Sequence, residues 1–221
     1  MSGRFFDAHQ RATVEAAMAR IIPTDDQPGA REAGTVEFVD RYLSGIDFIY
    51  AKPDGSGFEK LEGKRAQAWQ QRVDILRRKY VEGIAELDRR SRAELGADFV
   101  DLAPDRQDRI LAALERREPA ADPVPTTGPG YALNTEASAT TGGEPALQQT
   151  STETELDFVP LLVMHTRQGF YADPVYGGNR DRIGWRVIGF PGPASMAEVH
   201  NGTYSTLAWF AEGQGDHRYG A

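Results

Sequence analysis

The stretch RAQAWQQRVDILRRKYVEGIAELDRRSRAEL, residues 65–95, decides the fold class. Its apolar residues recur every three or four positions with charged residues between them, which is the pattern of one long amphipathic helix. These positions are Ala66, Trp69, Val73, Leu76, Tyr80, Ile84 and Leu87. Gly83 costs this helix about 1 kcal/mol relative to alanine without breaking it, and Gly96 is a natural stop.

Two shorter helices are predicted before this one. The first has Asp7 as its N-cap and Gln10 as the capping-box partner, and Pro23 ends it. The second runs from about Thr35 to near Tyr50. Their apolar stripes consist of Val14, Ala17, Met18, Ile21, Ile22, Val36, Val39, Leu43 and Ile46.

Two further helices are predicted after the long one. One opens with Pro104 in its first turn and carries Ile110, Leu111 and Leu114 inward. The other runs from about residue 157 to 168, and Gly169 ends it. Alternating strand patterns are scarce, so residues 5–117 are predicted to form an all-α bundle.

The second half of the chain changes character. Residues 118–154 are rich in Pro, Gly, Thr, Ser and Ala, which predicts a flexible insertion or, alternatively, an arm that orders against a partner. Residues 155–193 combine a helix with a loop rich in glycine and aromatic residues, and 194–221 are predicted to be an extended C-terminal arm. We therefore expect a single domain over 1–221, mainly α, made of a helical bundle with long irregular Gly-, Pro- and aromatic-rich loops and that arm.

Composition excludes several function classes. The chain has 25 Lys and Arg against 33 Asp and Glu, a formal net charge of −8, which argues against nucleic acid as a partner. It has no cysteine, so disulfides, Fe–S clusters, cysteine zinc sites and a cysteine nucleophile are excluded. No apolar run approaches the roughly 20 residues of a membrane span.

Motifs for chemistry within this chain are weak. The four histidines form no HxH or HExxH spacing, and His165 is interpreted as a core or supporting residue. Asp25-Asp26 and Asp54-Gly55-Ser56-Gly57 are similar to parts of calcium loops, but neither continues to a bidentate acid at the right offset, so both are interpreted as turns. Residues 176–179, Tyr-Gly-Gly-Asn, are interpreted as a tight turn in which both glycines and the asparagine take positive φ angles. No catalytic, cofactor-binding or metal-binding residue is predicted.

The chain resembles a known family in two blocks. The first block contains Phe5-Phe6, Gln10, Ile21-Ile22-Pro23-Thr24-Asp25, Pro28-Gly29-Ala30, Ala33-Gly34 and Phe38-Val39-Asp40. The second contains Thr166, Gly169-Phe170-Tyr171, Asp173-Pro174, Tyr176-Gly177-Gly178-Asn179, Gly184-Trp185 and Ile188-Gly189-Phe190-Pro191-Gly192. In their order and spacing these residues are similar to the gluconate 2-dehydrogenase subunit 3 family.

The resemblance implies a non-catalytic small subunit. Its partner would be a large FAD-dependent subunit of the glucose-methanol-choline type that oxidises a hydroxyl of a sugar, sugar acid or glycoside. FAD is then expected in that partner and no cofactor in this chain, and electrons leave in many complexes to a cytochrome c subunit. Many members carry a twin-arginine signal. None is seen here, so a cytoplasmic complex is expected, or a periplasmic one if the signal was removed or lies on the partner.

The resemblance and the residues together predict a partner interface, because aromatic side chains held by glycine and proline suit contact surfaces. Its residues are Tyr171, Asp173, Tyr176, Gly177, Gly178, Asn179, Arg180, Trp185 and Phe190 in the loop and Trp209 and Phe210 in the arm. Two alternatives stay open. The subunit contributes loop residues to the substrate site of the complex, or it is a free-standing small-molecule binding protein with the glycine loop as its lid.

Overall fold

The computed structural model describes residues 4–117, 152–190, 192–193 and 197–198. Over these residues the fold is mainly α, as predicted, with six α-helices and no β-strand. The helices are α1 (Ala8–Ile21), α2 (Thr35–Ser44), α3 (Gly63–Leu95), α4 (Pro104–Arg117), α5 (Phe158–Tyr171) and α6 (Ile183–Val187). Short 3-10 helices lie at Ile46–Phe48, Phe99–Asp101, Thr152–Thr154, Pro174–Tyr176 and Arg180–Arg182.

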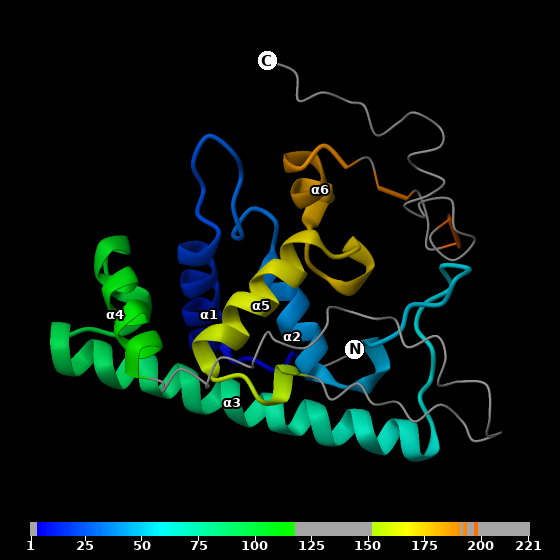
Figure 1. The fold of residues 1–221 in the computed structure, drawn as a ribbon, viewed down its shortest axis with the longest axis horizontal. Coiled ribbons are helices and arrows are strands. Elements are labelled where there is room, and N and C mark those ends of the chain that lie inside the picture. The colour runs from blue at the N-terminus through cyan, green and yellow to red at the C-terminus, as the bar shows by residue number, and fades with distance from the viewer. Residues whose placement is uncertain (1–3, 118–151, 191, 194–196, 199–221) are drawn as a thin grey trace, which may run out of the picture.

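The long helix α3 is the base on which the others pack. It contacts α1, α2, α4 and α5, and in Figure 1 it runs along the lower edge of the molecule with these four helices above it. The small helix α6 packs on α5 and lies away from α3, in the upper part of the view. The predicted insertion lies outside the described residues except for 152–154, and the part of the predicted arm beyond residue 198 lies outside them too.

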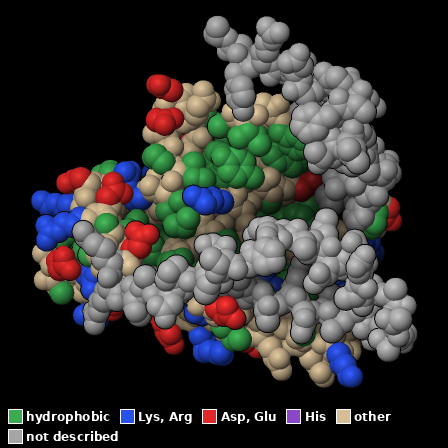
Figure 2. All heavy atoms as spheres, viewed as in Figure 1, with side chains coloured by type: hydrophobic (Ala, Val, Ile, Leu, Met, Phe, Trp, Pro, Cys, Tyr) green, Lys and Arg blue, Asp and Glu red, His purple; other side chains and the backbone are tan. Residues whose placement is uncertain are grey.

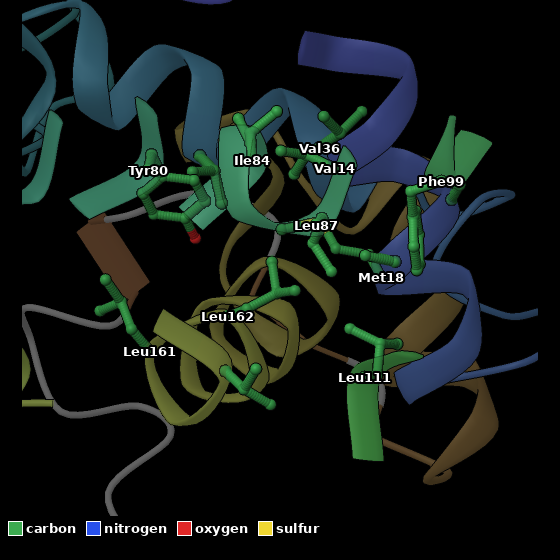
Figure 3. Packing of buried hydrophobic residues seen from close by; sticks show 14 of the residues in the cluster. Val14, Met18, Val36, Tyr80, Ile84, Leu87, Phe99, Leu111, Leu161 and Leu162 are labelled. Atoms are coloured by element: carbon green, nitrogen blue, oxygen red, sulfur yellow. The ribbon is translucent and has the colours of Figure 1, made fainter. Parts of the chain in front are cut away.

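The predicted apolar stripes meet in one core. Val14 and Met18 of α1 and Tyr80 and Leu87 of α3 are at most 1% exposed, and Figure 3 shows them in one packed group with Leu162 of α5. Burying such side chains is the main favourable term in folding, about 1.5–3 kcal/mol for each large one. The first turns of α3 extend beyond this core, so the predicted stripe residues Ala66 and Trp69 are only half-buried.

The observed helix ends confirm one of the predicted boundaries and contradict two others. Asp7 and Gln10 form the predicted capping box, with the Gln10 backbone N–H 2.8 Å from Asp7 Oδ1. The prediction that the second helix reaches Tyr50 is wrong, because α2 ends at Ser44 and Gly45, at φ 157°, turns the chain away. The prediction that Gly169 ends the fifth helix is also wrong, because α5 continues to Tyr171.

Gly169 has a packing role inside α5. A Cβ at this position would lie 2.8 Å from Thr35 Cγ2 and 3.0 Å from the Thr35 carbonyl oxygen, so the glycine lets α5 approach α2 closely. Gly83 likewise lets the Phe158 ring of α5 pack directly against α3, because a Cβ at position 83 would overlap that ring. Both glycines are therefore fixed by helix–helix packing rather than by chain reversal.

Candidate functional site: the glycine-aromatic loop and its groove

The glycine-aromatic loop, residues 172–190, is fastened to the end of α5 by specific hydrogen bonds. The Asn179 side chain donates to the Ala172 carbonyl oxygen at 2.8 Å and accepts from the Gly184 N–H at 2.8 Å. The Trp185 indole N–H donates to the Tyr171 carbonyl oxygen at 2.7 Å. Because these bonds span the loop from end to end, the loop is a folded element with one defined shape.

Close backbone contact explains two of the glycines. A Cβ on Gly178 would overlap the carbonyl oxygen of Gly169, and a Cβ on Gly184 would overlap that of Phe170. The interpretation of residues 176–179 as a turn is confirmed for Gly177, at φ 110°, and for Asn179, at φ 49°. It is wrong for Gly178, whose φ is not positive and which is needed for its close approach to α5.

The predicted interface residues differ in how far they are buried. Three of them are buried and hold the loop together, namely Gly178, Asn179 and Trp185. Four are half-buried: Asp173, Tyr176, Gly177 and Phe190. Tyr171, at 42%, and Arg180 are exposed to solvent. Trp209 and Phe210 lie outside the described residues.

Beside the loop lies a groove of about 550 Å³ that sequence reasoning did not anticipate. It is lined mostly by aromatic side chains from four separate segments: Phe38, Tyr42, Phe48, Ile49, Tyr50, Trp69, Arg72, Glu153, Gln168, Tyr171, Ala172 and Tyr176. Tyr176 joins the loop to the far wall, because its hydroxyl accepts from the Ala51 N–H at 3.2 Å and its ring meets that of Phe58 edge-on. Arg41 adds a second tie by donating to the Val175 carbonyl oxygen at 2.6 Å.

The floor of the groove is a buried polar network. Glu153, only 3% exposed, accepts from His165 Nε2 at 2.5 Å and from Arg72 Nε at 2.7 Å. On the other side of the fully buried His165 ring, the Tyr80 hydroxyl is 2.8 Å from Nδ1. Because an ionised carboxylate can only accept, Nε2 is the nitrogen that donates to Glu153. The Tyr42 hydroxyl, 3.3 Å from Glu153, completes the set. The interpretation of His165 as a core residue is confirmed.

Charge in this network is balanced. Burial raises the pKa of Glu153, but the hydrogen bonds of His165 and Arg72 and the Arg72 charge outweigh it and hold the pKa below its usual value. Burial raises the pKa of the Tyr80 and Tyr42 hydroxyls, and the Glu153 charge adds to it. Glu153 is therefore an ion-paired carboxylate that also accepts from the Tyr42 hydroxyl, while the Tyr80 hydroxyl holds the far side of the His165 ring. This arrangement fixes the 152–154 turn against α3 and α5.

Other candidate sites are structural. Asp25 and Asp54 each accept a backbone N–H two residues on, at 2.8 and 2.9 Å, as expected for turns. His9 pairs with Asp88 at 2.6 Å. Among the residues that the structure describes, no cluster of three or more His, Asp or Glu side chains could hold a metal ion, and no helix there is long and apolar enough to cross a membrane.

Comparison with known proteins identifies one family. Residues 8–192 match the family model described as Gluconate 2-dehydrogenase subunit 3, a span that includes α1 to α6 and the glycine-aromatic loop. No curated protein and no solved structure matches the chain. The matched span is most of the chain and contains both blocks of the resemblance except Phe5-Phe6. The chain therefore belongs to the gluconate 2-dehydrogenase subunit 3 family, and its role is that of a small subunit in a dehydrogenase complex with a larger subunit.

Proposed function

We propose that this chain is a non-catalytic small subunit that binds and stabilises a large FAD-dependent dehydrogenase of the glucose-methanol-choline type. The large subunit holds FAD and oxidises a CH–OH group of a sugar, sugar acid or glycoside, and a cytochrome c subunit is one acceptor for its electrons. The observation that carries the proposal is the family match over residues 8–192.

The loop supports the proposal through its construction. The polar groups of the Asn179 and Trp185 side chains are hydrogen-bonded within the loop and to the end of α5, while the Tyr171 side chain is exposed to solvent. A side chain presented on a rigid support loses little conformational freedom when a partner covers it, which favours tight association. This is the behaviour expected of a subunit whose purpose is to bind another subunit.

The direct test is co-purification. A tagged copy of the chain, expressed in its source cell, is expected to elute from size exclusion together with a larger subunit whose absorption spectrum is that of a flavin. Additional haem bands would identify a cytochrome in the same complex. Elution of the chain alone, with no flavin in any tagged fraction, would contradict the proposal.

The groove favours a second candidate in which this subunit also contacts substrate. Its volume falls in the range of small-ligand pockets, roughly 300–1,000 Å³. Tyr176 lines it and Arg180 is exposed on the same loop, whereas the amide of the buried Asn179 is already engaged at both ends. A changed KM for Tyr176→Phe or Arg180→Ala in an intact complex would support this candidate. A monomeric chain that binds a small ligand without a large subunit would instead indicate a free-standing binding protein.

A further inference from the structure

The helix α6 and the segment leading into it carry three exposed arginines, Arg180, Arg182 and Arg186, here called the basic rim. Arg182 is the N-cap residue of α6 and Arg186 lies in its last turn, and both side chains are exposed. No ion pair joins a rim arginine to a carboxylate among the described residues, and the Arg182 guanidinium lies over the Trp185 ring, 5.8 Å from its centroid.

The backbone under the basic rim is held in an unusual conformation. Asn179, Asp181 and Arg182 have φ angles of 49°, 53° and 58°, a region that residues with a side chain rarely occupy. The Arg180 N–H donates to the Ala33 carbonyl oxygen at 2.8 Å, and the Arg182 N–H donates to the Asn179 carbonyl oxygen at 2.9 Å. Asp181 and Arg182 are exposed, so their strained backbone gains no burial in return, and strain held in place at the surface is a mark of functional segments.

The charge of this region is opposite to that of the chain. Residues 167–190 contain four arginines, two aspartates and no lysine or glutamate, a net charge of +2, whereas the whole chain carries −8. One of the aspartates, Asp181, stands within the rim. A local excess of positive charge on an acidic protein orients this face toward an acidic surface during encounter.

Exposed apolar side chains accompany the basic rim. Of the three large hydrophobic side chains that are exposed in the described residues, two belong to this region, Tyr171 at 42% and Ile188 at 45%. Figure 2 shows hydrophobic side chains gathered around α6 and the end of α5 on the face in view. Tyrosine and arginine together are typical of the parts of interfaces that carry most of the binding energy.

We propose that the basic rim docks on an acidic surface of the large subunit, with Tyr171 and Ile188 as apolar contacts beside it. This inference rests on the proposed function and adds to it which face is bound and what chemistry the partner presents there. The rim sets the rate of encounter and the orientation, since charges at the edge of an interface act mainly on association.

The test compares two double charge reversals that change the net charge equally. R182E/R186E alters the basic rim, and R78E/R106E alters two exposed arginines on α3 and α4. The probe is the flavin-containing subunit that co-purifies with the wild-type chain, separated from it and titrated back at low and high salt. We expect R182E/R186E to weaken binding about tenfold or more at low salt, R78E/R106E to stay within about twofold, and the difference to shrink at high salt.

A conservative variant guards against misfolding. R182K/R186K keeps the charge and is expected to bind within about threefold of wild type, with thermal melts confirming that all variants fold. The inference would be refuted if the two reversal variants bound the flavin-containing subunit with equal affinity, or if the wild-type affinity did not change with salt concentration. Either result would leave the proposed function intact. If the wild-type chain retains no flavoprotein at all, the proposed function fails and this inference fails with it.

Discussion

Replacing Glu153 with alanine tests the buried network under the groove. The substitution leaves the Nε2–H of His165, which is fully buried, without an acceptor, a loss of about 2 kcal/mol. It also removes the charge-assisted bonds from Arg72, worth about 1.5 kcal/mol here because the Arg72 side chain is 23% exposed and can turn to water. We expect the free energy of unfolding to fall by about 3–4 kcal/mol.

The assay is urea unfolding of the purified chain at pH 7, followed by circular dichroism. Glu155→Ala is the matched control, because Glu155 is exposed two residues away and its loss should change stability by no more than about 0.5 kcal/mol. Glu153→Gln, which can still accept from His165, should fall between the two. Equal stability of Glu153→Ala and Glu155→Ala would refute the view that this network fixes the 152–154 turn.

The same network predicts a pH dependence. The pKa of Glu153 is lower in the folded chain than the ordinary value of 4.5, so the folded state favours the carboxylate. Its contribution to stability is therefore complete above the unfolded pKa and is lost as the pH falls through the lowered folded pKa. The stability difference between wild type and Glu153→Gln should be constant from about pH 5.5 to 7 and shrink at lower pH. A difference that grows on acidification would contradict the assignment.

Three more predictions concern the glycines and His9. Gly178→Ala should lower the free energy of unfolding by about 3 kcal/mol and expose the loop to limited proteolysis, because the new methyl group overlaps the backbone of α5. Gly83→Ala should destabilise the chain by about 1–2 kcal/mol although alanine favours helices, and should become stabilising in a Phe158→Ala background, where the obstructing ring is gone. The hydrogen bond to Asp88 raises the pKa of His9 in the folded chain. The contribution of His9 to the free energy of unfolding is therefore complete below the unfolded pKa near 6.5 and is lost as the pH rises through the folded pKa. The urea midpoint of His9→Ala should accordingly approach that of wild type at alkaline pH.

The helices were predictable because their signals are local. The capping box of Asp7 and Gln10 and the stripe from Val73 to Leu87 depend only on residues within one or two turns. The two wrong helix ends depend on tertiary structure. Gly45 and Gly169 look alike in sequence, yet one ends its helix and the other stays inside, where its missing side chain makes room for Thr35.

The candidate site was only partly predictable for the same reason. Composition marked the glycine-aromatic loop, but it could not tell that Asn179 and Trp185 point inward while Tyr171 points outward. Glu153 stands in a polar run with no periodicity, and its partner Arg72 is 81 residues away in the chain. Its burial follows from the meeting of α3 and α5, which no local pattern encodes.

The attachment of α6 also bears on the order in which the chain folds. Ala33, Phe170 and Ile183 form a small apolar cluster, separate from the main core, that joins the α1–α2 connection, the end of α5 and α6. Contacts between such distant segments form late, since the chain entropy of closing long loops must be overcome first. We therefore expect the surface around α6 to form only after the bundle is complete. A large subunit that docks there, as proposed above, would bind folded copies in preference to folding intermediates, so assembly would act as a check on folding.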